Sequence, residues 1–326
     1  MDAPAGPRGK GRFLFLGKFL ISGLLLAVLF WRVDRATFLR TLQSFPPRVF
    51  LGCLGLYALG YLISTVRWQL LLLAEGIHLP FWRVTLLYFQ GSFFGLFLPT
   101  LIGGDIFRGY ALYKITGGHD ASIASIVVDR LAGFAALIVI AVVALGLAYG
   151  EIRDPQVAGM IVAVAAAFTL MIAMLMHDGM KARASGVLRV VGLARFQAKL
   201  HGLVEALHRY RGHRWALAQA MLLSALLQSL LIVTYYLLGT GLSLGVPLPY
   251  FFLYVPLITF VAMLPVSVAG LGVREGGAVF FFARVGVDAA AALTMSLAWF
   301  SLSLVVSGLG GLAFLFNAHG AKRVES

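Results

Sequence analysis

Charged side chains within the apolar stretches of this sequence are the residues best placed to do chemistry. Six of them lie in or beside apolar runs, namely Asp105, Arg108, Asp129, Arg130, Arg274 and Glu275. A charge at the centre of a bilayer costs about 2.5–3.5 kcal/mol even on insertion scales, so such residues usually face a protein interior or an aqueous cavity. We therefore treat these six as candidate site residues.

Two of the arginines have the chemistry to hold a phosphate. Arg108 and Arg274 occupy matching places in two similar stretches, and the planar guanidinium matches a phosphodiester through paired N–H donors. Gly104 and Gly270 precede them and could present backbone N–H groups to the same anion. We predict that Arg108 and Arg274 converge on one lipid phosphate. The glycines could instead serve only tight turns or close helix packing.

The carboxylates allow two interpretations. Asp105 and Glu275 could tune the neighbouring arginines or accept a cationic group on a lipid. Asp105 and Arg108, three residues apart on a helix, could equally form a local ion pair. Asp129 and Arg130 could lie near a span end and reach the membrane interface. For this last pair, a functional and a structural role are equally supported by the sequence.

The two similar stretches are residues 94–109 and 260–275, which share residues at a fixed offset of 166. The matching pairs are Leu98 and Leu264, Pro99 and Pro265, Gly104 and Gly270, and Arg108 and Arg274. Proline removes a backbone donor, so polar backbone groups around it are left unpaired and need partners from protein or enclosed water. A matched pair of interrupted apolar segments, one in each half of a membrane protein, predicts a transport site built on repeats.

The composition predicts an all-α polytopic membrane protein with one domain over residues 1–326. The chain is 60% hydrophobic and 12% charged, with a mean hydropathy of +0.93, whereas soluble domains carry roughly 25% charged residues. Each interrupted stretch has too few apolar residues before its proline for the roughly 20 that a crossing needs, which favours a re-entrant hairpin. We predict two such hairpins and six full crossings, at about residues 13–31, 49–66, 122–149, 156–176, 216–238 and 289–316.

The basic loop at 177–215 sets the expected orientation. By the positive-inside rule this loop is cytoplasmic, and with it both termini. We expect the protein to lie in the inner (plasma) membrane of the cell. Span, hairpin and span at 49–149 then recur at 215–316 with opposite orientation, as an inverted repeat. If residues 84–103 crossed fully instead, the first two spans would flip.

Several function classes are excluded or disfavoured. The net charge of +13 comes from residues in loops and at span ends, which favours anionic lipid headgroups over nucleic acid as partners. The single cysteine, Cys53, rules out an intramolecular disulfide, and no HExxH, Walker A or GxSxG pattern occurs. We expect no metal, no cofactor and no enzymatic activity. Four tryptophans at predicted span ends fit an interfacial aromatic belt: Trp31, Trp68, Trp82 and Trp215.

Four short motifs carry a resemblance to a known family. They are Arg67–Trp68, GDIFRGYAL at 104–112, VVDRLAGF at 127–134 and LPVSVAGLGVREGG at 264–277. In this order and spacing, the chain resembles the lysylphosphatidylglycerol synthase transmembrane family, also called the flippase-like domain family. The resemblance implies a membrane domain that moves aminoacylated phosphatidylglycerol, or another lipid or lipid-linked precursor, between leaflets.

The resemblance also bears on the site residues. All six charged candidates correspond to the family's recurring charged positions, with Asp129 standing where glutamate is expected. Ten residues follow Phe316, so the aminoacyl-transfer domain of the two-part synthases is not expected here. We therefore expect a lipid translocase, alone or with a second copy or a biosynthetic partner protein. The alternative is a membrane accessory protein or transferase with Asp129 or Glu275 as general base.

Overall fold

The computed structural model describes residues 35–97, 103–148, 154–176, 209–263 and 267–322, together with single positions between residues 20 and 31. Apart from one short 3₁₀ turn, every regular element in these ranges is an α-helix, as predicted. The helices are α2 (Arg35–Ser44), α3 (Pro47–Ala74), α4 (Phe81–Phe97), α5 (Gly103–Thr116), α6 (His119–Ala148), α7 (Pro155–Met176), α10 (Arg214–Gly241), α11 (Leu248–Ala262), α12 (Val273–Ala283) and α13 (Ala289–Lys322); the turn is η1 (Tyr210–Gly212).

Five helices are long and apolar enough to cross a membrane, which confirms a polytopic membrane protein. They contain the spans Pro47–Ala74, Asp120–Leu147, Pro155–Met174, Arg214–Gly241 and Ala289–Phe314. These five correspond to five of the six predicted crossings. The sixth, at 13–31, lies almost entirely outside the described residues.

The end of the first described span was predicted too early. The polar residues after position 66 indicate a span end, yet α3 continues to Ala74. Arg67 and Trp68 are buried, and Arg67 is paired with Asp129 of α6. The prediction that Trp68 belongs to an interfacial belt is therefore wrong, whereas Trp31, Trp82 and Trp215 are exposed. A charge with a buried partner does not have to end a membrane helix.

Two pairs of short helices form the predicted hairpins. α4 packs against α5, and α11 packs against α12. They have 17, 14, 15 and 11 residues respectively, so at 1.5 Å per residue none reaches the roughly 30 Å of a hydrocarbon core. We call α4–α5 the first hairpin and α11–α12 the second. The connecting segments at 98–102 and 264–266, with their prolines, lie outside the described residues.

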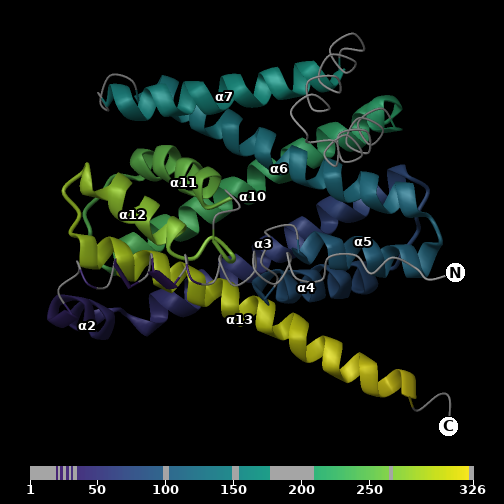
Figure 1. The fold of residues 1–326 in the computed structure, drawn as a ribbon, viewed down its shortest axis with the longest axis horizontal. Helices are drawn as coiled ribbons and strands as arrows, with labels where there is room; N and C mark the ends of the chain where they lie inside the picture. The colour runs from purple at the N-terminus through teal and green to yellow at the C-terminus, as the bar shows by residue number, and fades with distance from the viewer. Residues whose placement is uncertain are drawn as a thin grey trace, which may run out of the picture.

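The hairpins enter from opposite ends of the bundle (Figure 1). At one end, Arg209 forms an ion pair with Glu75, just beyond α3, and the Tyr210 hydroxyl donates to the Leu71 carbonyl. The first hairpin begins and ends near this end. At the other end, Arg284 after α12 pairs with Asp154 before α7. The second hairpin therefore opens toward the opposite membrane surface.

The two halves of the chain also match in helix position. An offset of 166 residues maps Pro47 to position 213, beside the start of α10, and Ala74 to position 240, beside its end. It maps the start of α4 to position 247, beside the start of α11. The packing is reciprocal, because α4 lies against α13 and α11 against α6, while α3 and α10 pack together at the centre.

The Asp154–Arg284 pair makes a pH-dependent contribution to stability. Burial raises the pKa of the Asp154 carboxyl, but hydrogen bonds from Arg284 and from the Val157 N–H outweigh it and hold the pKa below its usual 3.8. A depressed pKa stabilises the fold above that usual value, and the contribution is lost as pH falls through the folded value. Asp154→Asn should lower the free energy of unfolding at pH 7 by about 0.2–1 kcal/mol.

The test compares thermal melting of the wild type and Asp154→Asn across pH. Asparagine can still cap α7, where Asp154 accepts the N–H groups of Gln156 and Val157, so the variant removes mainly the charge. The difference in melting temperature should vanish in acid. A difference of equal size at all pH values would show that the ion pair is not its cause.

Candidate functional site

Three helices bring together a buried network that we call the arginine–aspartate cluster. It consists of Arg67 from α3, Asp105 and Arg108 from α5, and Asp129 and Arg130 from α6. Arg67 Nε lies 2.7 Å from Asp129 Oδ1, and Arg130 Nε lies 2.6 Å from Asp105 Oδ2. Four of the six predicted charged candidates thus meet in one place, together with Arg67.

Arg108 lies at the centre of this cluster and is held loosely by its carboxylate neighbours. Its Nη atoms lie 3.3 Å from Asp105 and 3.4 Å from Asp129. The guanidinium carbon lies 4.0 Å from the Trp68 ring centroid and 4.3 Å from that of Tyr88. Both rings present negative faces to the cation. Arg108 Nε is buried and has no hydrogen-bond partner among the described residues.

The cluster carries surplus positive charge. Three guanidinium groups face two carboxylates, which leaves one positive charge within the described network. Four of the side chains are at most 7% exposed, but that of Arg130 is 45% exposed. An unbalanced buried cation is costly in a membrane. The arrangement suits an anion that approaches past Arg130 toward Arg108.

Close helix packing supports this geometry. A Cβ atom added at Gly104 would collide with the Gly91 carbonyl oxygen, and one added at Gly91 would collide with the Arg108 side chain. The first hairpin can therefore close only with glycine at both positions. Gly104 serves helix packing here, so the structural interpretation fits it better than the predicted role as a backbone donor to an anion.

Arg274 and Glu275 form a second, separate site at the start of α12. Glu275 is fully buried and accepts from the Gly272 N–H at 2.6 Å and from Arg274 Nε at 3.0 Å. The hydroxyl of Ser296 on α13 lies 3.5 Å from the same carboxylate. Gly270, with φ of 75°, makes the turn that leads into the helix. Glu275 thus caps α12 and neutralises Arg274.

Arg108 and Arg274, which were predicted to converge on one anion, have different partners in the structure. Arg108 pairs with Asp105 and Asp129, whereas Arg274 pairs with Glu275 and lies 5.0 Å from the Phe300 ring. Within the described ranges, no carboxylate forms an ion pair with both arginines. We therefore describe them as two sites, one on the second helix of each hairpin, and their convergence on one anion stays a prediction.

Arg67 is a site residue that the sequence pattern did not predict. Arg67 binds Asp129 and also donates to the Ser224 hydroxyl of α10 at 2.9 Å, so it links three helices. The available signal was a charge followed by the apolar run from Leu70 to Ala74, which indicates a charge within a span. Tyr88 and Ser224 gave no such signal, because isolated tyrosines and serines are common in membrane helices.

Comparison with known proteins gives one match. A family model described as the lysylphosphatidylglycerol synthase TM region matches residues 15–311, which include both hairpins and both charged sites. No curated protein and no solved structure matches the chain.

Proposed function

The chain belongs to the lysylphosphatidylglycerol synthase transmembrane family, and from that premise we propose that it moves an anionic or modified phospholipid, or a lipid-linked precursor, between membrane leaflets. One observation carries the proposal. The arginine–aspartate cluster holds a surplus buried positive charge with one partly exposed member, and this is the electrostatic complement of a lipid phosphate.

The architecture supports movement between leaflets rather than binding alone. Hairpins that enter from opposite ends, each with an arginine on its second helix, offer one headgroup site to each leaflet. In proteins built from inverted repeats, rocking of one half against the other exposes a site alternately to the two sides. We propose that Arg108 serves one leaflet and Arg274 the other.

The state of the carboxylates favours a transporter over an enzyme. A general base needs a carboxylate lone pair within reach of the substrate proton. Asp129 accepts from Arg67 and Arg108, Asp105 from Arg130, and Glu275 from Arg274 and the Gly272 N–H. These ion pairs stabilise the ionised carboxylates and so weaken them as general bases, which disfavours the rival transferase mechanism.

We further propose an orientation. The end of the bundle with the Arg209–Glu75 pair adjoins the basic loop at 177–215 and lies in the cytoplasm, so the first hairpin opens to the cytoplasmic leaflet. The membrane is the inner (plasma) membrane, and the partners are its anionic lipids. A second copy of the chain or a biosynthetic protein could join the assembly.

Liposomes that contain the purified protein test this function. Fluorescent phosphatidylglycerol (anionic) and phosphatidylcholine (zwitterionic) are placed in both leaflets, and the fraction exposed to a membrane-impermeant quencher is followed with and without a proton gradient. We expect the wild type to speed redistribution of phosphatidylglycerol over protein-free vesicles. Arg108→Gln should slow it by about tenfold or more, because one charge-assisted contact is lost.

Two further variants test whether the effect is specific to the Arg108 guanidinium. Arg108→Lys keeps the charge but loses the planar group that stacks between Trp68 and Tyr88, so its rate should be intermediate. Arg83→Gln is the matched control, because Arg83 is an exposed arginine on the same hairpin. A wild type no faster than empty vesicles for any lipid would contradict transport. Equal rates for Arg108→Gln and Arg83→Gln would exclude Arg108 as the headgroup site.

A further inference from the structure

Three hydroxyl groups from three helices meet where the first hairpin crosses α13. We call Tyr61 of α3, Ser92 of α4 and Ser307 of α13 the hydroxyl triad. Tyr61 Oη lies 2.5 Å from Ser92 Oγ and 3.2 Å from Ser307 Oγ, and the two serine oxygens are 2.7 Å apart. Serine and threonine hydroxyls in membrane helices usually donate to their own backbone four residues earlier, as Ser301 does here. The triad bonds between helices instead.

The triad lies between the two charged sites. On one side, the Tyr61 ring is 5.9 Å from the Tyr88 ring, over which Arg108 is placed. On the other side, Tyr61 is 5.5 Å from Tyr57, one helical turn away. The Tyr57 phenol lies near Ser303 of α13, and the more distant charge of Arg274 still reaches it. The two tyrosines therefore continue a line of aromatic and polar side chains from Arg108 along one face of α3, in the direction of Arg274.

The helices around this route are tightly closed. A Cβ atom at Gly310 would collide with the Phe89 backbone, and one at Gly311 with the Phe93 ring. α4 and α13 therefore touch along a glycine seam beside the triad, and the hydroxyls satisfy one another. A headgroup can reach these hydroxyls only after α4 and α13 separate.

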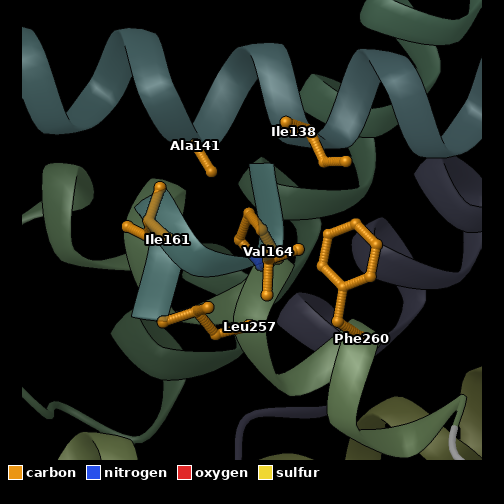
Figure 2. A pocket seen from close by; sticks show the side chains of 7 residues that line it. Ile138, Ala141, Ile161, Val164, Leu257 and Phe260 are labelled. Atoms are coloured by element: carbon orange, nitrogen blue, oxygen red, sulfur yellow. The ribbon is translucent and has the colours of Figure 1, made fainter. Parts of the chain in front are cut away.

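The equivalent crossing in the other half has different chemistry. Between α6, α7 and α11 lies a cavity of about 10 Å³, lined by apolar side chains such as Ile138, Leu257 and Phe260 (Figure 2). A cavity this small and apolar neither holds nor attracts water. The crossing at α4 and α13 therefore contains hydroxyl groups that can bind a polar group, whereas the cavity beside the crossing at α6 and α11 has an apolar lining.

We propose that the hydroxyl triad is a transit site for the phosphate group of a lipid that passes between Arg108 and Arg274. This inference rests on the proposed function. When α4 parts from α13, the three hydroxyls turn from one another and donate to the phosphate oxygens. Hydroxyl donors bind an anion more weakly than guanidinium groups do. A site on a transport path must bind the phosphate strongly enough for it to enter and weakly enough for it to leave.

Removal of the hydroxyls tests the site. We expect the triple variant Tyr61→Phe, Ser92→Ala, Ser307→Ala to slow redistribution of fluorescent phosphatidylglycerol in liposomes by about tenfold or more, since three contacts in the path are lost. Copurified phosphatidylglycerol, measured by native mass spectrometry, should stay at the wild-type level, because Arg108 and Arg274 are unchanged. Ser301→Ala, on the same helix as Ser307, is the matched control and should transport normally.

The outcomes separate this inference from the proposed function. If the wild type transports and the triple variant transports equally fast, the transit site is wrong and the translocase stands. If the wild type does not transport, both fall. Should the triple variant fail to fold, Ser92→Ala decides in its place, compared with Ser92→Thr, which keeps a hydroxyl. Equal rates for that pair would overturn the transit site.

Discussion

Asp129→Asn is expected to lower the free energy of unfolding by about 3–5 kcal/mol, because it removes the carboxylate from a buried ion-pair network. Asp129 is 1% exposed and neutralises Arg67 at 2.7 Å, while Arg108 lies 3.4 Å away. Asparagine has a similar shape but no charge, so Arg67 would remain buried without a carboxylate partner, and Arg108 would keep only Asp105. Unfolding in mixed detergent micelles, followed by tryptophan fluorescence or helix content, measures the loss.

Two comparisons show whether charge is the cause. In the double variant Arg67→Met, Asp129→Leu, both partners of the pair become apolar, and we expect most of the stability to return. Asp288→Asn is the matched control, because Asp288 accepts the Ala290 N–H at the start of α13, and asparagine caps a helix about as well as aspartate. If Asp129→Asn is as stable as Asp288→Asn, the network does not hold the helices together.

Glu275→Ala is expected to have a comparable effect at the second hairpin. The carboxylate is fully buried, caps α12 through the Gly272 N–H and pairs with Arg274, whose side chain is 13% exposed. Alanine would leave a largely buried guanidinium without its partner and an uncapped helix start. We expect a loss of about 3–5 kcal/mol in the free energy of unfolding, and with it the loss of phosphatidylglycerol transport.

Glu275→Gln separates the two contributions. Glutamine keeps an oxygen that can accept the Gly272 N–H, so α12 should retain its cap while Arg274 loses its counter-charge. The expected loss in unfolding free energy lies between those of the wild type and the alanine variant. With Arg274 no longer neutralised, the variant should also retain more copurified phosphatidylglycerol than the wild type. Retention at or below the wild-type level would argue against Arg274 as a headgroup contact.

The hairpins were predictable because their cause is local. Proline and glycine weaken a helix where they occur together in an apolar run, and the length of such a run limits what can cross a bilayer. These two patterns predict short helices on both sides of each break, and the observed α4, α5, α11 and α12 have this form. The candidate charges were predictable for the same reason, since a charge within an apolar run is visible without any partner.

The pairing of these charges was not predictable from local pattern. The sequence predicts that the span ends at residue 66, because only α6 supplies the carboxylate that allows Arg67 to be buried. It predicts Trp68 at the interface, because the contact of Trp68 with Arg108 joins residues from different helices. Arg108 and Arg274 were expected to share one anion because their places in the repeat match, and a repeat gives equivalence of position but not proximity.

By itself, then, the sequence determined that this is a helical membrane protein of the lysylphosphatidylglycerol synthase transmembrane family, with two interrupted segments and a small set of intramembrane charges. These properties follow from hydropathy, helix-breaking residues and motif order, all of which act along the chain. The tertiary structure alone decided which charges neutralise one another, which one is left in surplus and which hydroxyls lie between the two arginines. Those properties depend on side chains from helices far apart in sequence, whose contacts are fixed only when the helices pack.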